Sequence, residues 1–142
     1  MLVKGMIAGF VGTAVMSAMM VLKSMMGIVP ELDPVAMLAG MFGGPMALGW
    51  VMHFVIGTVA WGGGYALLYK ILPSDSSVIK GITFALAAWM VMMIVVMPMA
   101  GKGSFGMEIG IIAPIMTMML HVIFGAVMGL TFSKQISKTM PA

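Results

Sequence analysis

Long apolar stretches alternate with short polar ones along this chain. Four of these stretches carry no charged residue in their interior. An apolar run of about 20 residues is long enough to cross a ~30 Å hydrocarbon core as a helix. The pattern therefore predicts four membrane-spanning helices in a single domain of residues 1–142, over residues 4–26, 45–69, 81–100 and 110–132.

The connector between the first two stretches is broken by prolines. Glu31 and Asp33 lie between Pro30 and Pro34, where no helix can continue. Residues 34–42 are too few to span, so we expect a short helix in the interface, with Asp33 as its N-cap and Pro34 at its first position. The two carboxylates also suit a metal site, but carboxylates in a loop are more typical of a solvated cap.

The second and fourth stretches each contain a histidine followed by a glycine one helical turn later. His53 precedes Gly57, and His121 precedes Gly125. Residues three and four apart share a helix face, and on both faces the neighbours of the histidine are small. The two faces consist of Gly49, His53, Gly57, Ala60 and Gly64, and of Thr117, His121, Gly125 and Gly129.

The first and third stretches also resemble each other, since Lys4-Gly5 opens one and Lys80-Gly81 opens the other. The expected fold is therefore all-α: an integral membrane four-helix bundle made of two parallel two-helix repeats, related by an axis along the membrane normal. The first helix carries small residues at every fourth position, a face suited to close helix packing. These residues are Gly5, Gly9, Thr13 and Ser17.

Composition supports a membrane protein. The chain is 62% hydrophobic and only 8% charged, against roughly 25% charged in soluble domains. It has no cysteine, which excludes disulfides and thiolate-bound iron–sulfur clusters. Its 22 methionines are adaptable apolar fillers, so packing is their first interpretation.

The basic residues are all lysines, and they indicate topology rather than nucleic-acid binding. Five flank the N-terminal side of the predicted bundle and two flank the other side. The excess predicts that both termini are cytoplasmic in a prokaryotic inner membrane. The five are Lys4, Lys70, Lys80, Lys134 and Lys138; the two are Lys23 and Lys102.

The sequence contains no Ser/His/Asp set, no paired carboxylate within a helix and no phosphate-binding loop. An enzyme is therefore less expected than an electron-transfer or accessory protein. A single intramembrane histidine is most simply a hydrogen-bond partner of a neighbouring helix, here through Thr13, Ser17 or Thr117. Two histidines in matching positions favour a functional site instead.

One ligand that fits a histidine pair is haem b, with His53 and His121 as the two axial ligands of its iron. This arrangement resembles b-type membrane cytochromes, whose axial histidines come from alternate helices, and it implies electron transfer without an open iron position. Glycines one turn from each ligand would make room for the flat ring, and lysines would pair with the propionates. The expected cofactor-binding residues are His53, His121, Gly57, Gly125, Gly49, Thr117, Lys23 and Lys102.

The residues leave three alternative functions open. Cu(I) prefers thioether and imidazole ligands, and methionines occur along the predicted helices. Zinc or iron(II) transport is less favoured, because no acidic residue lies inside a span. A third alternative is a non-catalytic subunit of a larger redox membrane complex, or a homo-oligomer. The methionines considered for copper are Met16, Met19, Met20, Met93 and Met97.

Several longer motifs accompany these features over most of the chain. They are KGMIAGFVGTAVMS, PELDPVAML, GWVMHFVIGT, the glycine-rich turn at 101–106, APIMT and HVIFGAVMG. With them the chain resembles a family of small prokaryotic four-helix integral membrane proteins of unknown function. The resemblance implies the fold and the pairing of the two histidine motifs, and it implies no activity.

Overall fold

The computed structural model describes residues 1–137, and this part of the chain is helical without strands. Each of the four apolar stretches is a helix long and apolar enough to cross a membrane. The predicted all-helical membrane fold is confirmed. The first span is α1 (Leu2–Met25) and the fourth is α7 (Ile112–Ser137); the second consists of α3 (Met46–Val55), η1 (Ile56–Gly62) and α4 (Gly63–Leu68); the third consists of α5 (Ser77–Val91), η2 (Met92–Val96) and α6 (Met97–Met99).

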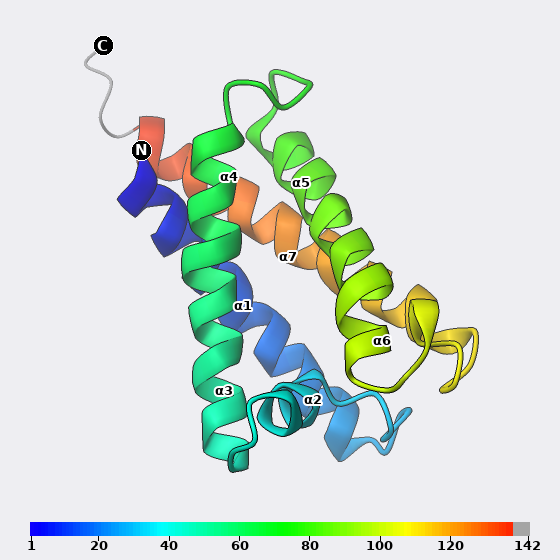
Figure 1. Ribbon diagram of the computed structural model, residues 1–142. Helices are drawn as coiled ribbons and strands as arrows, with labels where there is room; N and C mark the ends of the chain where they lie inside the picture. Colours follow the sequence, from blue (N-terminus) through cyan, green and yellow to red (C-terminus); the bar gives the residue numbers. More distant parts are fainter. Residues whose placement is uncertain (138–142) are drawn as a thin grey trace.

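The spans form two layers (Figure 1). α1 and α7 pack against each other, the second span packs on α1, and the third packs on α7. The second and third spans touch where Phe84 meets Trp61 and Tyr65, and they diverge towards the opposite end of the bundle. The start of α1 and the end of α7 lie at the end where these two spans are in contact, and there the Gln135 side-chain amide donates to the Lys4 carbonyl.

The small-residue face of α1 is the contact surface for the second span. A side chain at Gly5 or Gly9 would strike the backbone around Gly62, and one at Gly57 would strike Thr13. All four small residues of this face are buried. The predicted role of the face in close helix packing is confirmed, and the approach leaves no space for a methyl group.

A second glycine contact joins α5 to α7. A Cβ on Gly81 would strike the Gly125 carbonyl, and a Cβ on Gly129 would strike the Ser77 carbonyl. Each two-helix unit of the sequence is thus joined by glycines. The wider arrangement as two repeats stays a prediction.

The connector folds as expected at the end opposite the termini. A short helix, α2 (Pro34–Met41), begins at Asp33, whose carboxylate accepts hydrogen bonds from the backbone N–H groups of Val35 and Ala36. The predicted N-cap is confirmed. α2 packs on α3, where the Val35 carbonyl lies against Gly49. Together with the loop after α6, which contains the short η3 (Ser104–Gly106), α2 covers this end of the bundle.

Two helix ends differ from the predicted ranges by four residues or more, and the other ends of the spans differ by one or two. The third span begins at Ser77 rather than residue 81, because the Ser76 hydroxyl caps it by accepting from the Ile79 N–H. α7 continues to Ser137 rather than 132, since helix propagation does not stop where the residues become polar. Lys138 lies outside the described residues.

Candidate functional site

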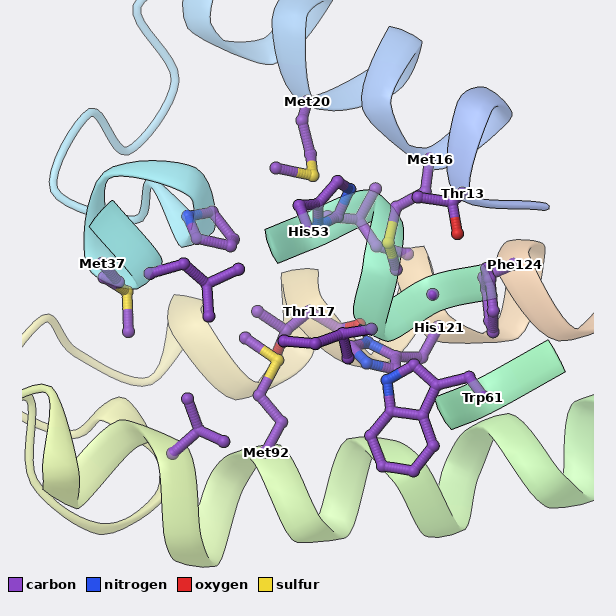
Figure 2. A pocket seen from close by; sticks show the side chains of 16 residues that line it. Thr13, Met16, Met20, Met37, His53, Trp61, Met92, Thr117, His121 and Phe124 are labelled. Atoms are coloured by element: carbon purple, nitrogen blue, oxygen red, sulfur yellow. The ribbon is translucent and has the colours of Figure 1, made fainter. Parts of the chain in front are cut away.

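A partly open cavity of about 120 Å³ lies between the four spans and α2, and both histidines line it. Figure 2 shows the imidazoles of His53 and His121 projecting into this space from the second and fourth spans. Its walls are otherwise almost entirely apolar. The lining residues are Thr13, Met16, Met20, Pro34, Met37, Leu38, His53, Ile56, Gly57, Trp61, Met92, Val96, Thr117, Leu120, His121 and Phe124.

The second and third spans both change from α-helical to π-helical winding beside the cavity. η1 and η2 are π-helical turns, and residues from each line the cavity. η2 immediately precedes Pro98, whose missing N–H and bulky ring disturb the regular hydrogen bonding of the turn before it. π-Turns inside α-helices occur frequently at functional sites. Here they set the directions of Ile56, Trp61 and Met92.

The hydrogen bond of His121 fixes its tautomer. Its Nδ1 lies 2.8 Å from the Thr117 carbonyl oxygen one turn earlier. A carbonyl only accepts, so Nδ1 carries the proton, and in the neutral ring Nε2 carries a lone pair. The side chain is 91% buried, with an exposed fraction of 9%. This arrangement, in which a backbone carbonyl orients the ring through Nδ1–H, is the one that metal-binding histidines commonly use.

His53 has the opposite tautomer. Its Nε2 lies 3.1 Å from the Ser17 hydroxyl oxygen on α1. The Ser17 hydroxyl already donates its only proton to the Thr13 carbonyl at 2.7 Å, so it can only accept from the imidazole. Nε2 therefore carries the proton, and in the neutral ring Nδ1 carries the lone pair. Ser17 was one of three partners that the sequence offered for a structural histidine.

Each histidine consequently keeps one nitrogen with no hydrogen bond in the described part of the chain: His53 Nδ1 and His121 Nε2. No side-chain nitrogen or oxygen within residues 1–137 is both fully buried and unpaired. The two free nitrogens are therefore accessible, and both rings line the same cavity. The site thus has two acceptor nitrogens, on two helices, in rings that line one partly open cavity.

Thr117 supports this arrangement from behind. Its hydroxyl donates to the Ala113 carbonyl at 2.7 Å and accepts from the Trp89 indole N–H at 3.0 Å. α7 is thereby tied to α5 next to the carbonyl that orients His121.

The glycines expected beside a flat ring have other partners. Gly57 lines the cavity, but its missing side chain makes room for Thr13 on α1. Gly125 faces Gly81 and Ala85 of α5, and Gly49 faces α2. Gly125 and Gly49 do not line the cavity. Close helix packing, rather than space for a ligand, explains why these positions are glycine.

The two lysines expected near propionates lie outside the cavity. The Lys23 ammonium donates to three carbonyls of the connector, at 2.8 to 2.9 Å: those of Ile28, Val29 and Leu32. Lys102 lines a separate open hollow with Glu31 and Asp33. Both lysines therefore lie with the connector and the loops at that end of the bundle.

The methionines divide between two places. Met16, Met20, Met37 and Met92 line the cavity, whereas Met93 and Met97 are fully buried in a second apolar cluster with Leu32. Met19 packs at the edge of the main core. Among the described residues no three His, Cys, Asp or Glu side chains gather as a metal-ligand set.

Sequence reasoning missed the contributions of Trp61, α2 and the two π-turns. Met37 and Leu38 of α2 cover one side of the cavity. No pattern in the sequence indicates which apolar side chains a π-turn directs inwards.

A family of unknown function, DUF6789, matches residues 1–140. The chain belongs to this family. Neither curated proteins nor solved structures provide a match.

Proposed function

We propose that this member of a family of unknown function is an intramembrane binding protein that holds one ligand group between His53 and His121. The observation that carries the proposal is that both imidazoles line one cavity and that each keeps one nitrogen without a hydrogen bond in the described part of the chain. Polar groups inside the hydrocarbon region are costly, and an intramembrane ionisable residue is functional by default. Packing alone would be better served by apolar side chains at both positions.

The surroundings support ligand entry from the bilayer. α1 and α7 close the back of the cavity, and Phe84 closes the contact between the second and third spans near the termini. The second and third spans diverge towards α2 (Figure 1), and Ile56 of η1 and Met92 and Val96 of η2 line the partly open cavity. We propose that a ligand enters between these two spans. An apolar molecule dissolved in the membrane reaches the histidines by this route without crossing water.

Filling the cavity tests the proposal. Val96 lines it, whereas its neighbour Val95 is exposed and does not. We expect wild-type protein reconstituted with lipid extract from its own membrane to carry a bound molecule at about one per chain, measured by native mass spectrometry. Val96→Phe should lose most of this bound mass, and the matched Val95→Phe should keep it.

The same preparations provide the contrary result. If the wild-type protein carries no molecule beyond exchangeable lipid, and Val96→Phe behaves identically, the cavity has no binding function. Comparable far-ultraviolet circular dichroism and thermal unfolding of the two valine variants would show that both are folded.

A second candidate ligand is haem b, favoured by the tautomer of His121, which leaves Nε2 available to an iron. His53 would have to release its Nε2 from Ser17, and the cavity would have to widen for a ring built from four pyrroles. When bound, the haem would supply one-electron transfer. A Soret band in the wild-type preparation, absent from both His53→Leu and His121→Leu, would identify haem as the ligand.

The membrane in which the protein lies and its orientation there are also proposals that follow from the sequence. We infer a multi-pass protein of a prokaryotic cytoplasmic membrane with both termini in the cytoplasm, supported by the excess of lysine at the terminal end. Two partners stay predictions: a larger redox membrane complex, and a second copy of the chain.

A further inference from the structure

We infer that the ligand group is a quinol: a para-dihydroxylated ring whose two hydroxyls donate to His53 Nδ1 and His121 Nε2. The inference rests on the proposed function and names the ligand class of the same cavity. It starts from the chemical character of the two free nitrogens rather than from the presence of histidine alone.

Both free nitrogens are acceptors. The Thr117 carbonyl can only accept, so it holds the proton of His121 on Nδ1. With the Ser17 hydroxyl donating to the Thr13 carbonyl, the Ser17 oxygen accepts from Nε2 of His53. A ligand that satisfies both nitrogens must therefore bring two donors. A quinol has one O–H at each end of its ring, so a single molecule brings the two donors.

The cavity is close in size to one aromatic ring. Its volume is about 120 Å³, somewhat below the roughly 150 Å³ of an apolar cavity that binds benzene, so a substituted ring has to extend through the open side. The apolar wall suits the faces of such a ring, since Leu120, Phe124 and Ile56 line it between the polar groups. A porphyrin needs several times this space.

The open side of the cavity fits an apolar tail. A lipid-soluble quinol carries its tail on the ring, and the tail has to leave the protein into hydrocarbon. We assign the exit to the side where the second and third spans diverge, and Trp61, Met92 and Val96 of these spans line the cavity. Met92 and Val96 are apolar, and the indole of Trp61 is apolar apart from its N–H group.

The oxidised form of the ligand lacks the required donors. A quinone presents two carbonyl oxygens, which would face the two imidazole lone pairs without a proton between them. Each polar group left unpaired in this way costs about 1–3 kcal/mol, equivalent to about 5–150-fold in affinity. We therefore expect quinol to bind at least about tenfold more tightly than quinone.

The experiment uses the full chain in lipid nanodiscs under argon. Three probes share one ring and one decyl tail: decylubiquinol kept reduced, decylubiquinone, and the dimethyl ether of the quinol. Binding is followed by thermal shift and by the intrinsic fluorescence of the three tryptophans, of which Trp61 lines the cavity. We expect saturable binding of the quinol and at least about tenfold weaker binding of both other probes.

Two variants test the acceptors. His121→Phe and His53→Phe keep an aromatic ring but remove the lone pair, and each should weaken quinol binding about tenfold while changing quinone binding little. Val95→Phe, outside the cavity, should bind quinol as the wild type does. The comparison of the three probes on wild-type protein stands even where a histidine variant fails to fold.

Other outcomes overturn the inference. Equal binding of all three probes would show that the nitrogens do not act as acceptors, while the cavity remains a binding site. Binding of haem or Cu(I) without any quinol binding would leave the proposed function and refute the ligand class. Absence of quinol binding together with absence of any bound molecule in native mass spectrometry would overturn both.

Discussion

At the scale of single residues, two groups outside any ligand motif decide which nitrogen of each histidine is free. Ser17 and the Thr117 carbonyl each hold one imidazole nitrogen, and they hold different ones. The pair would otherwise be two interchangeable rings. Their hydrogen bonds turn it into a defined set of two acceptors with known atoms.

These tautomers are directly measurable. In ¹⁵N NMR of the labelled protein in nanodiscs at neutral pH, we expect a protonated Nε2 and an unprotonated Nδ1 for His53, and the reverse for His121. Ser17→Ala should remove the fixed tautomer of His53 and leave His121 unchanged. It should also lower the free energy of unfolding by about 0.6 kcal/mol, the typical value of a hydrogen bond between membrane helices.

Ser133→Ala is the matched control, because Ser133 is partly exposed and its hydroxyl bonds only within its own helix. If Ser17→Ala leaves the His53 spectrum unchanged, the hydrogen bond between α1 and α3 does not determine its tautomer.

At the scale of elements, glycines set how closely the helices approach. Lipid is as apolar as the helix surfaces, so membrane helices gain little from hiding apolar area and associate through close packing instead. The contacts of α1 with η1 and of α5 with α7 both follow this rule. The cavity survives because the second and third spans lack a comparable glycine contact beside the histidines.

Enlarging a glycine at such a contact should therefore separate the helices. Gly125→Leu places a side chain against the Gly81 carbonyl, and we expect it to reduce stability by about 1–3 kcal/mol, the usual cost of overpacking. Gly40→Leu is the control, since nothing lies within 4 Å of a Cβ at Gly40. Thermal unfolding in detergent compares the two variants, and equal midpoints would contradict a packing role for Gly125.

At the scale of the whole molecule, an even number of spans brings both termini to one end, and α2 covers the opposite end (Figure 1). His53 follows the start of α3 by seven residues, and His121 follows the start of α7 by nine. Both rings thus lie within about 14 Å, along their helices, of the α2 end. The ligand group would lie in the membrane half away from the termini.

The side on which this half lies can be tested with reporter fusions. Fusions after residues 75 and 103 probe the two ends of the bundle. We expect cytoplasmic reporter activity at 75 and non-cytoplasmic activity at 103, because lysines concentrate at the terminal end. The opposite pattern would invert the orientation and place the cavity in the cytoplasmic half.

The sequence by itself determined the elements of this protein. Four charge-free runs specified four spans, because hydrocarbon admits only backbones that satisfy their own hydrogen bonds. Asp33 and Pro34 specified the start of α2, and the small residues of α1 specified its packing face. These features depend on residues that are close together along the chain, so the sequence alone reveals them.

The arrangement of the site depends on contacts between helices, which exist only in the folded chain. The direction of each glycine depends on which helix lies opposite, so Gly57 and Gly125, alike in sequence, face α1 and α5 respectively. The π-turns rotate one part of a span against the other, which fixed helical spacing does not foresee. The free nitrogen of each histidine depends on Ser17, 36 residues away, for one ring, and on a backbone carbonyl for the other. These are properties of contacts between helices and of rotamers, and residue spacing along one helix does not contain them.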